Sequence, residues 1–447
     1  MPMLQPQIES RRFDLPPILA RIAHRWLVAS CYLALLMPLV VVPWVLFPYT
    51  FGKAIYLSTG IAAALPALIL VRTARPLERN HHTPITLALL LYVCAMAIAT
   101  TFSIDPLRSF WGNAERGTGL WLLIHYALLF FALSSVFRSV ADWTRVLTFS
   151  VGVAFVVSVL AFLQKFGLLT PLHQGSERAS SLIGNPAFLA EYLFFNIFFT
   201  LWLAVRPQKH RTRYLLMALL LTQTAALALT ETRAAVIGLY SAVCVYVGLN
   251  AALQGCRGSR SAFALAALVL ALAPIAAWTA ASHPYFKEMP GLKRFSGLSW
   301  HSVNVEARLI NWSIALQGFT ERPITGWGPE TYRYVFDRHY KPRVEQLAMP
   351  AKEFDHPHNK PLELLCDAGL IGAMAFVCCV FLVLAHLISS RRLGVLDVQT
   401  FSVALAVGVG YLVQSLFLFD HPIGLLMLSV SLAWWHSIMP LPISLAA

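Results

Sequence analysis

The chain has 447 residues, of which 58% are hydrophobic and only 12% are charged. Soluble domains carry about 25% charged residues, so this composition excludes an ordinary soluble enzyme and predicts an all-α polytopic membrane protein. The formal net charge is +13, but no nucleic-acid-binding motif accompanies it, so we expect no nucleic-acid partner.

The predicted elements begin with an N-terminal tail, 1–25, followed by apolar runs long enough to cross a bilayer, which takes about 20 residues. We interpret that tail as cytoplasmic, because the apolar run after it is too long for a signal peptide and no cleavage pattern follows. A long polar loop, 282–360, separates spans one to nine (26–281) from spans ten to twelve (361–439), and a short tail, 440–447, follows and is predicted to be cytoplasmic. About twelve transmembrane helices are predicted, at 26–47, 54–71, 84–102, 119–136, 144–164, 186–205, 214–230, 234–253, 261–281, 361–388, 399–418 and 422–439.

The charges of the connections predict the orientation of the spans. One side holds 17 of the 34 Lys and Arg residues but only 5 of the 21 Asp and Glu residues. Positive residues favour the cytoplasmic side, so the long loop is predicted to face outward and to be partly helical. The segments on the positive side are 1–25, 72–83, 137–145, 206–213, 254–260 and 389–398.

The seven cysteines fall mostly in apolar runs and none lies in the long loop. This argues against a disulfide framework and against a cysteine metal site. His356 and His358 are spaced by Pro357 and lack a clear third ligand, so we expect no metal and no other cofactor.

The loop ends in Asp355-His356-Pro357-His358-Asn359, directly before an apolar helix. Histidine is the side chain best suited to proton transfer near neutral pH, and His358 is our candidate catalytic base. Asn359 can cap the helix, whose N-terminal dipole would disfavour a second proton on His358. His356 is a possible supporting residue. The alternative is a histidine that only ties the loop to the helix end.

Two arginines are candidates for binding a phosphate. Arg233 lies in a turn of about three residues between two apolar runs, and a guanidinium binds phosphate oxygens in a fork. The alternative is an arginine that reaches headgroups or pairs with Glu231. Arg308 lies in a predicted amphipathic helix, 305–319, on whose apolar face Leu309, Trp312, Leu316 and Phe319 repeat.

Several other polar residues occur on the outward side. Asn185 opens span six, and Glu191, about one turn into it, is either functional or the buried partner of an arginine. The glycines of the turn 323–328 are predicted to serve backbone geometry. We interpret Asp105, Arg108, Arg116, Asp420 and His421 as structural.

The order of these motifs over residues 184–372 resembles the O-antigen ligase and polymerase superfamily of bacterial envelope glycosyltransferases. Pro361, three residues after His358, departs from the usual pattern. The motifs are Gly184-Asn185-Pro186 with Ala190, Thr232-Arg233, Arg308 with Trp312, Pro323 to Gly328 with Tyr332, and His358-Asn359 with Leu362-Glu363 and Gly369 to Gly372.

The resemblance implies a metal-independent enzyme of the bacterial inner membrane with its active site facing the periplasm. Its donor would be an undecaprenyl-pyrophosphate-linked glycan, and membrane lipids would surround it. Arg233 and Arg308 would bind the pyrophosphate, and His358 would act on the acceptor, with Asn185, Glu191, Trp312, His356 and Asn359 in support.

Our first hypothesis is an O-antigen ligase whose acceptor is the lipid A-core. The alternatives are an O-antigen or exopolysaccharide polymerase with another glycan as acceptor, and a protein O-oligosaccharyltransferase. A transporter is disfavoured, because the chain shows no convincing internal repeat.

Overall fold

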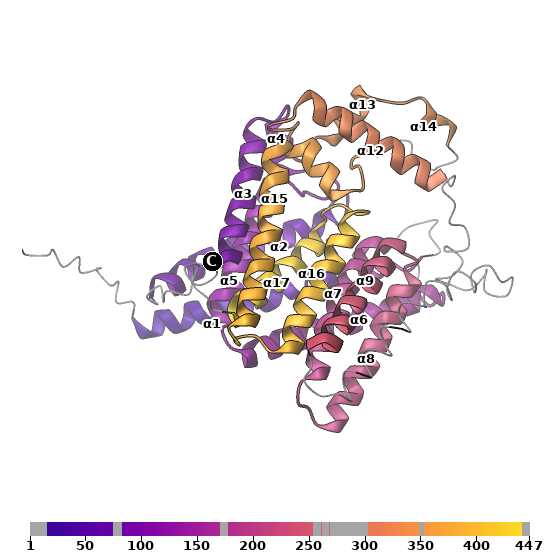
Figure 1. The fold of residues 1–447 in the computed structure, drawn as a ribbon. Helices are drawn as coiled ribbons and strands as arrows, with labels where there is room; N and C mark the ends of the chain where they lie inside the picture. Colours follow the sequence, from indigo (N-terminus) through magenta and orange to yellow (C-terminus); the bar gives the residue numbers. More distant parts are fainter. Residues whose placement is uncertain are drawn as a thin grey trace, which may run out of the picture.

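The computed structural model describes residues 16–74, 83–169, 178–253, 303–347 and 353–439, together with Ser261 and Leu268. Regular structure in these ranges is helical, without strands. Long helices form a bundle, and further helices lie across one end of it (Figure 1). The long helices are α1 (Pro17–Leu35), α2 (Phe51–Ala74), α3 (Pro84–Thr101), α5 (Leu120–Val136), α6 (Val140–Lys165), α7 (Pro186–Val205), α8 (His210–Leu229), α9 (Arg233–Leu253), α15 (Lys360–Arg392), α16 (Val398–Ser415) and α17 (Pro422–Ile438).

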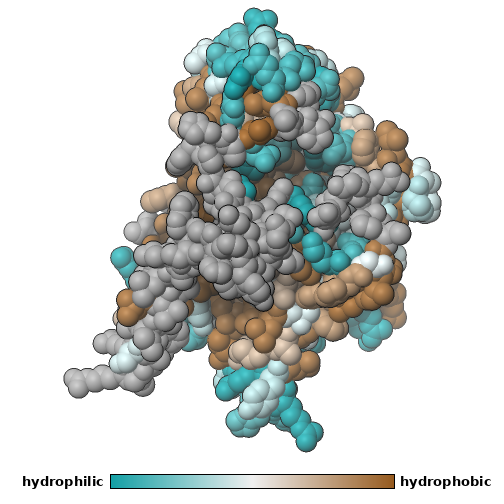
Figure 2. Space-filling model, turned by 90° about the vertical axis from the view of Figure 1, so that its right-hand side faces the viewer, coloured by the Kyte–Doolittle hydropathy of each residue, from teal (hydrophilic) through white to brown (hydrophobic). Residues whose placement is uncertain are grey.

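These helices confirm the prediction of an all-α polytopic membrane protein. In the described part of the chain, nine helices are long and apolar enough to cross a membrane, and α5 and α17 are shorter apolar helices. The predicted ninth span, 261–281, lies outside the described residues apart from Ser261 and Leu268. Polar side chains gather at the two ends of the molecule, and apolar side chains cover much of the visible surface between them (Figure 2).

The first helix differs from its predicted position. The span was predicted at 26–47, but α1 covers Pro17–Leu35, and a short 3-10 helix, η1 (Met37–Leu39), follows it. The apolar run is continuous in hydropathy, but it contains Pro38, Pro43 and Pro48. Proline lacks the N–H that a helix interior needs and its ring clashes with the preceding turn, so the helix ends before the first of them.

Four helices form a cap over one end of the bundle, and all but α12 are short: α4 (Pro106–Trp111), α12 (Val303–Glu321), α13 (Tyr332–Arg338) and α14 (Arg343–Gln346) (Figure 1). Leu309 and Leu316, which lie on the predicted apolar face of α12, are 50% and 46% exposed. The packed face instead contains small residues such as Ala315 and Gly318, which let α12 approach its neighbours closely.

The cap is joined to the bundle at a break in α15. Gly369 has φ +59° and ψ −154°, outside the helical region. The N–H of Leu370 donates to the carbonyl of Pro323 at 2.8 Å, and the N–H of Trp327 donates to the carbonyl of Cys366 at 2.9 Å. The turn after α12 therefore takes up backbone groups on both sides of the break, and it sets the position of the first two turns of α15.

The glycines of the turn 323–328 serve backbone geometry, as predicted. Gly326 and Gly328 have φ values of +69° and +111°, which side-chain-bearing residues rarely adopt. A Cβ on Gly326 would lie 2.4 Å from the carbonyl oxygen of Asp367, and a Cβ on Gly328 would lie 1.9 Å from Ser103 Oγ. Only glycine lets the turn lie against both α15 and the segment before α4.

Candidate active site

His358 lies in the segment 353–359, between the cap and α15. Its backbone is left-handed, with φ +54°, a conformation that costs a non-glycine residue about 1–2 kcal/mol. The ring makes an edge-on contact with Phe419, with 5.0 Å between ring centroids. Strained backbone of this kind concentrates at functional sites, where the surroundings hold it in place.

The hydrogen bonding of His358 defines its tautomer. Its Nδ1 lies 3.0 Å from the carbonyl oxygen of His356. A carbonyl oxygen only accepts, so Nδ1 carries the proton and Nε2 keeps a lone pair. Burial, and next the positive charge of Arg308, lower the pKa of His358 to about 4. The sequence also predicted a neutral His358, but on the basis of the helix dipole. In the structure, desolvation and the neighbouring Arg308 are the main causes of its lowered pKa.

Arg233 and Arg308 come from different elements, and their charges influence each other. Arg233 is the first residue of α9, and Arg308 lies on α12. Burial, and next the charge of Arg233, lower the pKa of Arg308. The guanidinium of Arg308 also lies over the ring of Phe417, 5.9 Å from its centroid. Two guanidiniums that repel each other form a cationic site, and a dianion would relieve the repulsion.

Hydrogen bonds from a neighbouring arginine stabilise the turn that presents Arg233. Arg178 Nε donates to the carbonyl of Thr230 at 2.8 Å, and its Nη2 donates to Thr232 Oγ1 at 2.8 Å. Glu231, the predicted alternative partner of Arg233, forms an ion pair with Lys165 at 3.4 Å. Arg178 was not singled out from the sequence, because its partners lie more than 50 residues away.

Two of the predicted supporting residues hold the segment that carries His358. Asn359 caps α15, with its Oδ1 accepting the N–H of Leu362 at 3.1 Å, as predicted. Trp312, one turn after Arg308 on α12, donates its Nε1–H to the carbonyl of Pro357 at 3.1 Å. The helix that carries Arg308 is thus bonded to the residue directly before His358.

His356 is part of a buried cluster behind His358. Its ring is 1% exposed and stacks on Phe419, with 4.2 Å between ring centroids and 7° between ring planes. Its Nδ1 lies 2.5 Å from Glu363 Oε1. Burial lowers the pKa of His356, but the charges of Glu363 and Glu330 raise it by more, to about 9. At pH 7 His356 is therefore an imidazolium, and its carbonyl orients the ring of His358.

Arg116, which the sequence led us to interpret as structural, completes this cluster from the other side. Arg116 forms an ion pair with Asp355 and lies over the ring of Phe419, 4.9 Å from its centroid. Burial raises the pKa of Asp355, but His356 and Arg116 lower it by more, so the net shift is downward. The ring of Phe419 thus contacts Arg116, His356 and His358, and it lies between these three side chains.

Glu191 pairs with a histidine rather than with the arginine considered from the sequence. His421 Nε2 lies 2.7 Å from Glu191 Oε2. His421 Nδ1 accepts the N–H of Gly424 at 3.2 Å, so the ring also caps α17. Asn185 caps α7, accepting the N–H of Ala187 at 2.8 Å. Both residues hold helix ends, and Glu191 anchors the 416–421 segment that carries Phe417 and Phe419.

Replacing His356 by alanine is expected to lower kcat by about 10- to 100-fold with little change in KM. The backbone carbonyl remains, but it loses the ring contacts with Glu363 and Phe419 that hold it toward His358. His339→Ala, a histidine at the end of α13 paired with Glu321, is the matched control. An unchanged kcat for His356→Ala would show that the cluster has no influence on the reaction.

The pH dependence of activity shows whether the charge of His356 matters for the reaction or whether its ring only packs in the cluster. The imidazolium of His356 persists below its pKa of about 9, so wild-type activity is expected to decline as the pH rises through that value. In Glu363→Gln the ion pair is absent, and the decline is expected to move toward the ordinary histidine range near 6.5. A decline at the same pH in both proteins would contradict this role.

The comparison with known families agrees with this arrangement. The family model described as O-Antigen ligase matches residues 215–377. The matched segment contains Arg233, Arg308 and His358, whereas Asn185 and Glu191 lie before it. No curated protein matches the chain. Residues 215–377, which carry all three principal candidate residues, are thus similar to the O-antigen ligase family, and this similarity supports the resemblance to the O-antigen ligase and polymerase superfamily.

Proposed function

We propose that this protein is an O-antigen ligase. It transfers a glycan from undecaprenyl pyrophosphate to a hydroxyl of the lipid A-core, at the periplasmic face of the bacterial inner membrane. The observation that carries the proposal is the neutral His358 beside Arg308, which in turn lies beside Arg233. A base and a paired cationic site are the two requirements of glycosyl transfer from a pyrophosphate.

Arg233 and Arg308 bind the pyrophosphate of the donor. As the bond between the anomeric carbon and the phosphate oxygen breaks, negative charge grows on the leaving pyrophosphate. Two fixed guanidiniums stabilise that charge, in a partly desolvated site where their attraction for it is stronger than in water. This supports a transfer without a metal ion.

His358 takes the proton of the acceptor hydroxyl on Nε2. The hydroxyl oxygen attacks the anomeric carbon from the side opposite the pyrophosphate, so the anomeric configuration inverts. Nδ1 remains bonded to the His356 carbonyl throughout, and the imidazolium later releases the Nε2 proton to solvent. Trp312 and Asn359 keep the segment in place through Pro357 and the start of α15.

The test is reconstitution with an undecaprenyl-pyrophosphate glycan and purified lipid A-core, in the presence of EDTA. We expect glycosylated lipid A-core with an inverted linkage, without any divalent cation. A strict requirement for a divalent metal would contradict the arginine-based mechanism. Longer lipid-linked chains in place of glycosylated lipid A-core would move the assignment to a polymerase.

A further inference from the structure

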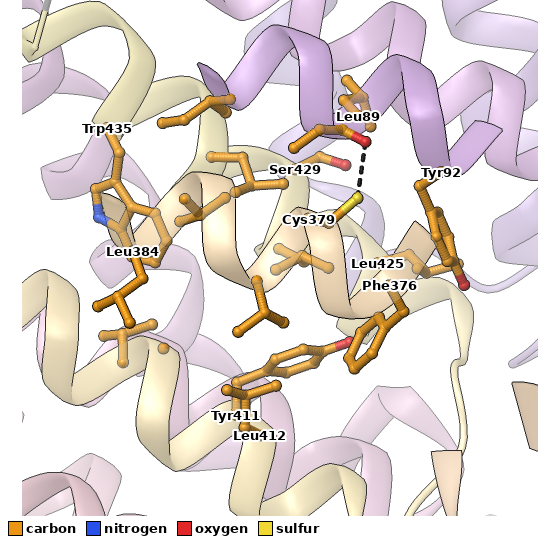
Figure 3. Close-up of a pocket in the computed structure, with 18 of the residues that line it drawn as sticks. Leu89, Tyr92, Phe376, Cys379, Leu384, Tyr411, Leu412, Leu425, Ser429 and Trp435 are labelled. Atoms are coloured by element: carbon orange, nitrogen blue, oxygen red, sulfur yellow. Dashed lines mark hydrogen bonds between the residues drawn. The ribbon is translucent and has the colours of Figure 1, made fainter. Parts of the chain in front are cut away.

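A long apolar cavity of about 230 Å³ lies among the membrane-crossing helices on the far side of α16 from Arg233. It is bounded by α3, α5, α7, α15, α16 and α17, and Figure 3 shows leucine and aromatic side chains pointing into it. On α17 its lining extends from Leu425 to Trp435, which is about 15 Å along a helix. The cavity is therefore elongated along the helices, a shape that fits an extended hydrocarbon chain.

Two features of the sequence produce this space. α15 packs mainly on α3 and much less on α16. On the opposite wall, Gly408 presents no side chain, and a Cβ at that position would meet no atom within 4 Å. The remaining wall is apolar, with residues such as Leu384 and Leu412 (Figure 3).

The polar end of the cavity lies next to the candidate base. Lys360 and Asp420 line this end and form an ion pair of 2.8 Å. Lys360 follows His358 by two residues, and Asp420 follows Phe419, whose ring contacts His358. A lipid with its chain in the cavity would therefore have its headgroup beside His358.

The cavity and the arginine pair lie on different sides of α16. Among the described residues, none that line the cavity belongs to α9 or α12, the helices of Arg233 and Arg308. α16 packs along α9 and separates that helix from the cavity. The phosphates of a donor bound at the two arginines would therefore lie away from this cavity. The cavity is then available to the second lipid substrate, the acceptor.

We propose that this cavity binds an acyl chain of the lipid that accepts the glycan, and so places an acceptor hydroxyl at His358. This inference rests on the proposed function, since it requires an acceptor that carries hydrocarbon chains.

The first test compares two substitutions that add the same side chain at equally open glycines. Gly408→Leu fills the cavity, whereas Gly152→Leu adds a leucine on α6, where a Cβ also meets nothing within 4 Å. We compare kcat/KM for acylated lipid A-core with kcat/KM for the deacylated core sugar. The ratio is expected to fall about tenfold in Gly408→Leu, the effect of displacing roughly two methylene groups. It should keep the wild-type value in Gly152→Leu. An unchanged ratio in both variants would overturn the proposal.

The second test needs no transfer reaction and no variant. Lipid A-core with a diazirine in one acyl chain is expected to label α15 and α17 on irradiation, and unlabelled lipid A-core should compete. Labelling of these helices by a diazirine in the polyprenyl chain of the donor would overturn the proposal. So would labelling by a phospholipid probe that lipid A-core does not displace.

These tests distinguish the failure of this inference from the failure of the proposed function. Competed labelling without any glycan transfer would leave the lipid site standing and contradict the ligase. Normal transfer without acyl labelling of the cavity would contradict the lipid site alone.

Discussion

His358→Ala is expected to lower kcat by about 10²- to 10⁴-fold, the usual range for loss of a general base. Among the described residues of the loop, the ring forms its hydrogen bond through Nδ1, while Nε2 is kept unprotonated, so the loss falls on the proton transfer rather than on the fold. The measurement is the turnover of reconstituted protein with saturating donor and acceptor. His339→Ala, on the same side of the molecule, is expected to retain wild-type turnover. Near-normal turnover of His358→Ala would remove this residue from the chemistry.

The pH dependence offers an independent check on the same residue. The pKa of His358 is lowered to about 4, so its base form persists well below neutrality and activity should remain level as the pH falls from 7 toward 5. Arg308→Gln removes one of the causes of this shift, so the acidic limb of the remaining activity is expected to move to higher pH. An acidic limb near 6.5 in the wild type would mean that the ring is an ordinary exposed histidine.

The spans were predictable because membrane-crossing helices need long apolar runs, and the sequence contains them with few interruptions. The displaced first helix shows the limit of that rule. Hydropathy alone continues past Leu35, whereas Pro38 makes a continuous helix unfavourable. On α12, two apolar stripes compete, and tertiary packing selected the one with Ala315 and Gly318 because close approach requires small side chains.

The individual residues of the candidate site could be predicted from the sequence, but the contacts between them could not. Arg233, Arg308 and His358 each lie near a helix end or on the polar loop, which local reasoning can recognise. The ion pair between Arg116 and Asp355 joins residues 239 positions apart, and the pair of Glu191 and His421 joins residues 230 apart. Pairings at such separations depend on how the helices pack, which one sequence does not contain.

The second large loss of activity is expected from substitutions of Arg233 and Arg308. Arg308→Lys and Arg233→Lys are each expected to lower kcat/KM by about 10²- to 10³-fold, the scale for losing a preorganised group that stabilises transition-state charge. Lysine keeps the charge but lacks the planar fork that binds two phosphate oxygens at once. The matched control is Arg343→Lys, whose arginine pairs with Glu306 in the cap and is 59% exposed. Full activity of the lysine variants would show that a point charge is enough.

The same variants separate donor binding from catalysis. Burial, and next the charge of Arg233, lower the pKa of Arg308, so the two cations repel each other and a pyrophosphate between them would relieve that repulsion. The donor should therefore raise the Tm of the wild type, since a ligand that binds only the folded state stabilises it. The rise should be much smaller in Arg308→Lys, and it should persist in His358→Ala, which keeps both guanidiniums. An equal rise in all three proteins would place the pyrophosphate away from the arginines and leave His358 without a donor beside it.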